Sequence, residues 1–328
     1  MAELKLAVRM DAIPGTGASA TALRKSLTIA ASMGVRSVEL CGRTHVPVSE
    51  LSDTGVRTLR KILDDLNLRI ASIRFQTRFG YDVTDHLDER VDATKSAMKT
   101  AYRLGAPLIV NQIGTVPPPP QNIDQAVKKA GSSLLLGSSS ETDDADWSND
   151  LPADLAAELA NSIASSRIGK AIAGQGAKGS EASRWETLRE VMEDLGRYGA
   201  KVGCFLAAET GTESGKDLAA LLDAIPDTFV PVALNPGQLI INRFRVDEAI
   251  NALASRISIV HAVDGVVDLA AGRGVAVPVG EGTADFPSML GRLEDIPYRG
   301  PFVVGRPEMR PETAIMELQQ SLEYLRNL

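Results

Sequence analysis

Cysteine is scarce in this sequence, with two residues among 328. Cys41 and Cys204 are too few and too far apart for a disulfide framework or a Cys-x-x-Cys site. Both lie inside apolar runs, so we predict two buried, reduced thiols. Histidine is almost as rare, with three residues, which disfavours a zinc cluster that needs many histidine ligands.

Runs of basic residues and long apolar runs are also missing. Lys and Arg number 35 against 42 Asp and Glu, a net charge of −7, whereas nucleic-acid binding would normally show a basic patch. The opening "MAELKLAVRM" lacks the basic and apolar regions of a signal peptide. No run approaches the roughly 20 apolar residues of a membrane span. We therefore expect a cytoplasmic protein without a nucleic-acid or membrane partner.

What the sequence does contain is a regular alternation of short β-branched runs and amphipathic segments, in a chain that is 44% hydrophobic. This alternation predicts one domain, residues 1–328, folded as a (β/α)8 TIM barrel, because an open doubly wound sheet usually has fewer strands. The first turn has Gly15 and Gly17 but no third glycine, so no nucleotide cofactor is expected. The eight expected strands are 4–10, 36–42, 69–75, 107–113, 202–210, 229–235, 257–263 and 300–306.

One long segment, 115–182, breaks this alternation. It opens with "VPPPP", continues through "GSSSETDDADWSND" and contains one credible helix, "LPADLAAELANSIA". Because it leaves the carboxyl end of the fourth strand, a barrel would place this insertion on its carboxyl-terminal, active-site face. It could serve as a lid, as the contact arm of a homo-oligomer, or as a decoration with no role.

The carboxyl ends of the strands are where a barrel carries its chemistry, so polar residues there are the candidates. Glu209 follows "CFLAA", and a carboxylate after such a run needs a partner, either in a structural salt bridge or in a working site. His261 follows "ISIV" and precedes Asp264, which favours a working role over a satisfied core histidine. Arg74 and Arg306 could hold a phosphate or carboxylate, or simply pair with nearby acids.

A longer pattern joins these candidates. Glu209 on the fifth expected strand is followed by "LNPGQ" on the sixth, "HAVDG" on the seventh, and then by "VGEGTADFPSMLGRL" and "YRGPFVV". This pattern resembles the xylose isomerase-like superfamily of (β/α)8 barrels, which contains sugar and sugar-phosphate isomerases and epimerases and the endonuclease IV group. The turn with "GEG" and "DFP" is the most specific part, and the resemblance covers nearly the whole chain apart from the insertion.

Members of that superfamily commonly hold a divalent metal with a Glu from the fifth strand, an Asp from the sixth, a His from the seventh and a Glu from the eighth. Glu209 and His261 match this pattern. Asn235 takes the place of the Asp, Gln238 that of a common nearby histidine, and Asn111 stands where the fourth strand often carries a histidine. The carboxamides thus look like substituted ligands, which bring no charge to a metal.

The acid of the eighth strand would fall at Gly305, and the next residue is Arg306. Two carboxylates of the pattern are therefore replaced, and a guanidinium beside a dication would weaken its binding further. From the resemblance we expect Mn, Mg or Zn to bind weakly or not at all, through Glu209 and His261.

The resemblance implies an isomerase or epimerase acting on a sugar or sugar phosphate, with Glu209 as general base and His261 or Arg306 stabilising the enediolate oxygen. The substrate would be a small molecule, anionic if the strand-end arginines bind it. A noncatalytic barrel that binds a sugar-like ligand after losing its metal is the alternative. An endonuclease IV-type phosphoesterase is a third, disfavoured by three histidines and the acidic net charge. The expected substrate contacts are Arg74, Asn111, Asn235, Gln238 and Glu308.

Overall fold

The computed structural model describes residues 3–17, 19–47, 51–120, 181–268, 272–307 and 309–328. Residues 1–117 and 185–328 form one compact unit, and residues 118–184 belong to a second. The predicted insertion, 115–182, lies for the most part outside the described residues, as does Glu308.

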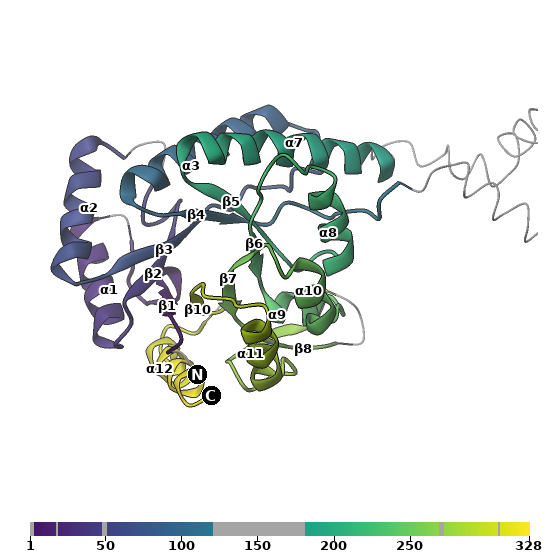
Figure 1. The fold of residues 1–328 in the computed structure, drawn as a ribbon. Helices are drawn as coiled ribbons and strands as arrows, with labels where there is room; N and C mark the ends of the chain where they lie inside the picture. Colours follow the sequence, from purple (N-terminus) through teal and green to yellow (C-terminus); the bar gives the residue numbers. More distant parts are fainter. Residues whose placement is uncertain (1–2, 18, 48–50, 121–180, 269–271, 308) are drawn as a thin grey trace, which may run out of the picture. The chain divides into compact units, whose positions relative to one another are not determined.

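Eight strands of the first unit close into a barrel in which every neighbouring pair is parallel (Figure 1). Their order around the barrel is β1-β10-β7-β6-β5-β4-β3-β2. Each lies within one of the eight predicted strand ranges, and the (β/α)8 prediction is confirmed. The strands are β1 (Leu6–Arg9), β2 (Ser37–Cys41), β3 (Arg69–Arg74), β4 (Leu108–Asn111), β5 (Phe205–Glu209), β6 (Val232–Leu234), β7 (Ile257–Ala262) and β10 (Phe302–Val304).

Helices connect the strands and bury one apolar face each against the outside of the barrel. Serine side chains begin several of them: Ser19, Ser52 and Ser214 each accept a hydrogen bond from a backbone N–H of the first turn. The helices are α1 (Ala20–Ser32), α2 (Asp53–Asp65), α3 (Leu87–Leu104), α7 (Glu181–Val202), α8 (Gly215–Asp223), α9 (Pro236–Ile241), α10 (Val246–Leu253), α11 (Phe286–Asp295) and α12 (Ala314–Arg326), with a 3-10 turn at Met10–Ala12.

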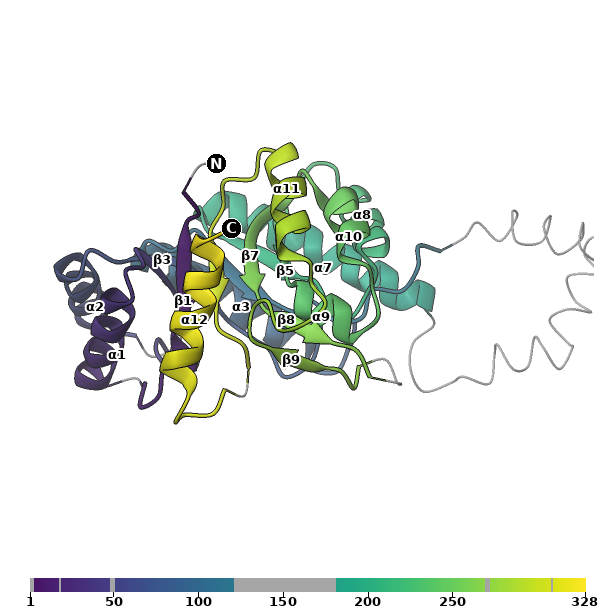
Figure 2. The ribbon, with the colours of Figure 1, turned by 90° about the horizontal axis from the view of Figure 1, so that it is seen from below.

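A small antiparallel hairpin interrupts the alternation after β7. It consists of β8 (Asp264–Val266) and β9 (Val275–Val277), and α9 packs against both strands (Figure 2). Asp264 holds the turn that follows, because its carboxylate accepts backbone N–H groups from Gly265, Gly280, Gly282 and Ala284 at 2.8 to 3.1 Å. The "GEG" motif therefore surrounds a buried carboxylate. The hydrogen bonds of the Asp264 carboxylate go to the backbone of this turn and not to His261.

Alternation along the strands decides which side chains point into the barrel. Ala207 of β5 and Ile259 of β7 belong to the apolar cluster that fills the interior. Glu209 and His261 lie two residues further along the same strands, so they face the same side, at the carboxyl end. The complete interior cluster is Ala7, Ala71, Leu108, Val110, Ala207, Ala233, Ile259 and Val303.

Both cysteines are free thiols. Cys204 is buried as predicted, and burial raises its pKa to about 12. Cys41 is only half-buried, because it is the last residue of β2 and meets the loop that follows. Among the described residues, no helix is long and apolar enough to cross a membrane.

Candidate active site at the barrel mouth

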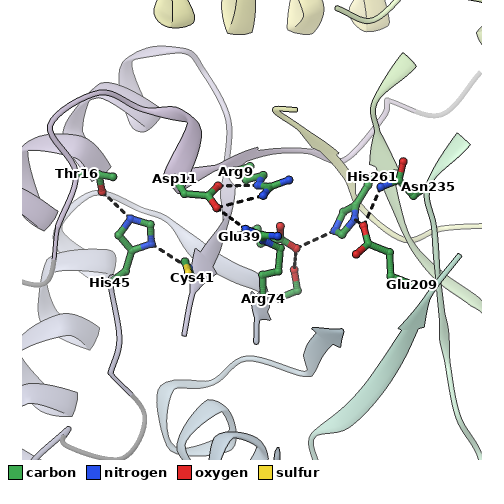
Figure 3. A network of polar contacts seen from close by, with 11 residues as sticks. Arg9, Asp11, Thr16, Glu39, Cys41, His45, Arg74, Glu209, Asn235 and His261 are labelled. Carbon is green, nitrogen blue, oxygen red and sulfur yellow. Dashed lines mark hydrogen bonds and ion pairs between the residues drawn. The ribbon is translucent and has the colours of Figure 1, made fainter. Parts of the chain in front are cut away.

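His261 lies between two glutamates at the carboxyl end of the barrel (Figure 3). Its Nδ1 is 2.7 Å from Oε1 of Glu209, and its Nε2 is 2.9 Å from Oε2 of Glu39. The three side chains come from β7, β5 and β2, and each is at most 5% exposed. The arrangement is a buried chain of two charge-assisted hydrogen bonds centred on one imidazole.

The charges of this cluster follow from its geometry. Burial lowers the pKa of His261, but the two neighbouring carboxylates outweigh that effect and raise it to about 10. Burial likewise raises the pKa of Glu209, yet the charge and hydrogen bond of His261 lower it to about 2. The pKa of Glu39 is also lowered, against the effect of burial, by His261. At neutral pH the cluster is therefore an imidazolium between two carboxylates.

Asn235 completes the hydrogen bonding of Glu209. Its Nδ2 donates to Oε1 of Glu209 at 2.8 Å, and its Oδ1 accepts the backbone N–H of Gln238 at 3.1 Å. The second bond caps the first turn of α9, and the backbone N–H of Asn235 donates to Thr210 Oγ1 at 2.9 Å. The Asn-Pro-Gly-Gln sequence thus starts a short helix directly at the strand end.

Ser72 supports Glu39 from the neighbouring strand. The register of β2 and β3 shifts between Val38 and Glu39, so that Ser72 is the partner of Glu39. Ser72 Oγ donates to Glu39 Oε2 at 2.6 Å. The other oxygen, Oε1, is buried and has no hydrogen-bond partner among the described residues. Glu39 therefore keeps one acceptor for water or a ligand.

Two arginines share one aspartate beside this cluster. Arg9 Nε lies 2.6 Å from Asp11 Oδ1, and Arg74 Nη2 lies 2.8 Å from Asp11 Oδ2. Burial raises the pKa of Asp11, but the two guanidinium groups lower it to about 2. The Nε of Arg74 is buried and has no partner in the described part of the chain. Arg74 thus retains a donor that a bound molecule could use.

His45 links two of the loops at this end of the barrel. Its Nδ1 accepts the backbone N–H of Cys41 at 2.9 Å, and its Nε2 lies 2.7 Å from Thr16 Oγ1. Burial lowers the pKa of His45, so the ring is neutral and Nε2 carries the hydrogen. This neutral histidine holds the loop after β1 against the loop after β2.

The remaining predicted site residues have other partners. Arg306 binds both oxygens of Glu317 on α12, with Nε 2.6 Å from Oε1 and Nη2 2.9 Å from Oε2. Asn111 donates to Thr77 Oγ1 and to Tyr81 Oη, each at 3.0 Å. The structure therefore brings together Glu209, His261 and Asn235, with Arg74 bound to the adjacent Asp11, and places the hydrogen bonds of Arg306 and Asn111 elsewhere. Gln238 is half-buried on α9, and Glu308 is not among the described residues.

Sequence reasoning did not assign Glu39 and Asp11 to the site, although both stand at strand ends. The signal for Glu39 is a single acid inside the apolar run "SVELC". A carboxylate buried in such a run requires a positive partner, and His261 supplies it. Asp11 carries a similar signal, because it is a single acid between the buried residues Met10 and Ala12 in the short turn after β1.

The superfamily pattern implies a divalent metal, and the side chains as arranged do not fit one. Both ring nitrogens of His261 are bound to carboxylates, the amide nitrogen of Asn235 faces Glu209, and Gly305 has no side chain to offer. Within the described residues, no group of three or more His, Cys, Asp or Glu side chains could hold a metal ion. A cation here would have to displace the proton of a histidine whose pKa is about 10.

The fold and the strand-end site together define a (β/α)8 barrel of the kind that carries its chemistry in its carboxyl-terminal loops. A family model described as xylose isomerase-like TIM barrel matches residues 27–135 and 141–328. The chain belongs to this family. No curated protein matches it.

Several solved structures share the fold at low sequence identity. A xylose isomerase domain protein from Planctomyces limnophilus is 18% identical, with a TM-score of 0.69 and coverage of 99% of this chain and 97% of the other. The IOLI protein, crystallised with a zinc atom, is 14% identical, with a TM-score of 0.66 and coverage of 99% and 98%. D-allulose 3-epimerase from Methylomonas sp. is 18% identical, with a TM-score of 0.61 and coverage of 99% and 98%.

Proposed function

We propose that this protein is an isomerase of small sugars or sugar phosphates in which Glu209 removes a proton from the carbon next to the carbonyl group. The observation that supports this is the position of Glu209: it is buried at the end of β5 and is held ionised by His261 and Asn235. A general base must be deprotonated when it acts, and Glu209 is so at neutral pH. The xylose isomerase-like family and structural neighbours named as D-allulose 3-epimerase and L-ribulose 3-epimerase support the substrate class.

The remaining charges suit an enediol-forming reaction without a metal. Proton removal leaves negative charge on the substrate oxygen, and nearby cations stabilise it. The Nε of Arg74 is buried and has no partner among the described residues, so we assign Arg74 as the donor to that oxygen or to a phosphate. Arg306 would first have to leave Glu317. We propose that a divalent metal is at most substoichiometric and that no step passes through one.

A noncatalytic sugar-binding barrel is the second candidate, and one observation favours it. With a pKa of about 2, Glu209 is a weak base, and its Oε1 is already engaged by His261 and Asn235. A carboxylate fixed in this way can accept hydrogen bonds from the hydroxyl groups of a ligand without removing a proton from it.

Incubation with sugars in D₂O tests both candidates. D-allulose, D-fructose and L-ribulose are the probes, and the readouts are deuterium uptake at carbon, new sugar signals, and the shift in unfolding temperature. We expect wild-type protein to exchange deuterium, Glu209→Gln to lose exchange while keeping the thermal shift, and Glu190→Gln, an exposed change on α7, to match wild type.

The outcomes separate the two functions. A thermal shift without exchange in wild type would establish the binding protein. Exchange retained in Glu209→Gln would show that another group is the base. Neither exchange nor thermal shift with any of the sugars, with or without added Mn²⁺, would exclude both candidates for this substrate class.

A further inference from the structure

A second glutamate is buried directly after β5. Glu213 is 3% exposed, and its Oε2 accepts a hydrogen bond from Thr212 Oγ1 at 2.7 Å. Its Oε1 is buried and has no partner among the described residues. A buried carboxyl oxygen without a partner is costly and points to a water or ligand that bonds to it. Neither the superfamily pattern nor the strand-end positions draw attention to this residue.

The loop that carries Glu213 is held on two sides. Gly211 has a φ of +154°, and a Cβ at this position would lie 2.7 Å from the Cβ of Gln238 on α9. Thr212 Oγ1 also lies 3.1 Å from the backbone oxygen of Gly114, which follows β4. The loop is therefore fixed between neighbouring strand ends, and α8 begins immediately after it with Ser214 as its N-cap. The backbone position of Glu213 is therefore fixed by the contacts of the residues on either side of it, Gly211 and Thr212 before it and Ser214 after it.

The surroundings of Glu213 favour its protonated form near neutral pH. Burial raises its pKa, the negative charge of Glu209 raises it further, and hydrogen bonds from Thr212 and the backbone lower it, with a result of about 7. The residue that faces the loop from α9, Gln238, is uncharged, and the β4 side contributes a backbone carbonyl. The single hydroxyl proton of Thr212 can serve either Gly114 or Glu213 at one time.

Two carboxyl groups four residues apart therefore have opposite environments. Glu209 is paired with an imidazolium and stays ionised, whereas the one side chain that is hydrogen-bonded to Glu213 in the described part of the chain is the uncharged Thr212. Enzymes that move two protons in one reaction use such pairs, one member as base and the other as acid. The pairing was not expected, because the superfamily pattern offers Glu209 as its one matching acid.

We propose that Glu213 is the proton donor of the site, giving its carboxyl proton to the substrate carbonyl oxygen while Glu209 takes the proton from the adjacent carbon. This inference rests on the proposed isomerase function. The C–H electron pair becomes the C=C bond of the enediol, and the carbonyl oxygen becomes a hydroxyl. In the second half, Glu209 returns its proton to the former carbonyl carbon, and the hydroxyl on the other carbon gives its proton back to Glu213, so both groups are regenerated.

The test is the pH dependence of turnover of D-allulose, D-fructose or L-ribulose by wild type and variants. A proton donor must be protonated, so wild-type kcat/KM should fall above about pH 7. Glu213→Gln should lower kcat by roughly 10²- to 10⁴-fold and abolish this fall. Thr212→Val removes a bond that stabilises the carboxylate, so the fall should move to higher pH. Glu190→Gln is the exposed control.

A second readout does not depend on activity. Protein labelled with ¹³C at the glutamate carboxyl carbon should show one resonance that titrates near pH 7 and is missing in Glu213→Gln. If Glu213→Gln does not fold, as judged by circular dichroism, the test of the proton donor is the pH profile of Thr212→Val: its fall should lie at higher pH than that of wild type.

Two results would overturn the proposal in different ways. If Glu209→Gln is inactive but Glu213→Gln keeps the rate and the pH profile of wild type, the isomerase function stands and Glu213 is not its proton donor; an unmoved profile in Thr212→Val has the same meaning. If wild type does not act on any of the sugars, the proposed function fails and this role fails with it, whatever the titration shows.

Discussion

The Nε2 atom of His261 lies 2.9 Å from Oε2 of Glu39, so that a histidine of β7 and a glutamate of β2 meet across the mouth of the barrel. Two strands, β1 and β10, separate them around the barrel. With Glu209 on the other ring nitrogen, the cluster holds two negative charges and one positive charge. The positive charge of Arg9, which is itself paired with Asp11, also lowers the pKa of both glutamates.

Removing His261 should strongly destabilise the protein. His261→Ala leaves two buried carboxylates without their shared cation, and breaking a buried ion pair in this way costs about 3–5 kcal/mol. Urea unfolding at neutral pH measures the loss. His86→Ala is the control, because His86 is exposed and pairs only with exposed Asp85 and Glu89 in the described structure. Its φ of 49° is slightly less favourable for alanine, so the free energy of unfolding should fall only slightly. A loss in His261→Ala no larger than in His86→Ala would contradict the ion cluster.

The same cluster predicts two pH limits of stability. The pKa of Glu209 is lowered from 4.5 to about 2, so its contribution is complete above 4.5 and is lost as pH falls toward 2. The pKa of His261 is raised from 6.5 to about 10, so its contribution is complete below 6.5 and is lost as pH rises through 10. From Glu209 and His261 alone, urea midpoints should be highest between about pH 4.5 and 6.5. Glu213, whose pKa is raised from 4.5 to about 7, adds a decline of its own as pH rises from 4.5 to 7.

A His261→Gln variant separates these limits. It has no titratable ring, so the part of the decline due to His261 should disappear, although the variant is less stable throughout. The parts due to Glu213 up to about pH 7 and to Cys204 above pH 9 should remain, so the difference between the two proteins is read between pH 7 and 9. A wild-type midpoint that does not change from about pH 6 to 10 would show that His261 is not held as an imidazolium.

Protein purified without chelator should contain much less than one divalent metal per chain. The reason is the donor set: His261 is bound on both nitrogens, and Asn235 and Gly305 stand where the superfamily pattern has carboxylates. Elemental analysis before and after addition of Mn²⁺ and dialysis measures the content. One tightly held ion per chain, lost in His261→Ala, would contradict the absence of a metal site and would indicate a metal-dependent isomerase.

The turn around Asp264 should not tolerate a side chain at Gly282. A Cβ there would lie 2.2 Å from Asp264 Oδ1 and 2.5 Å from the backbone oxygen of Gly265, so Gly282→Ala should cost about 1–3 kcal/mol. Gly291→Ala is the control, since Gly291 lies in α11 with open space around it and alanine should stabilise the helix by about 0.5–1 kcal/mol. Equal unfolding midpoints for the two variants would contradict the packing at this turn.

The barrel and the positions of two candidate site residues could be predicted from local pattern. Eight strand runs separated by amphipathic helices predict a closed (β/α)8 barrel. The alternation of side chains along β5 and β7 then predicts that Glu209 and His261 point to the same side as the interior residues Ala207 and Ile259. For a residue at the end of a strand, the neighbouring residues in the sequence are enough to predict which way its side chain points and at which end of the barrel it lies. No information about distant parts of the chain is required.

The partners of these residues could not be predicted in this way. Glu39 and His261 are 222 residues apart, and Arg306 pairs with Glu317 of α12, not with an acid of the barrel mouth. Asn235 looked like a replaced metal ligand and is also the cap of a six-residue helix. Hydrogen bonds and ion pairs form only between groups a few ångströms apart in space. Which groups come that close depends on the course of each loop, and a local sequence pattern does not predict that course.

The sequence by itself therefore determined the barrel and the carboxyl-terminal location of Glu209 and His261, because strand and helix periodicities are local properties. The tertiary structure alone decided that His261 is held between two glutamates and that Glu213 is buried with one oxygen that has no partner in the described part of the chain. These features set which groups are charged, since the pKa of a buried group depends on burial and on neighbours that come from distant strands and loops.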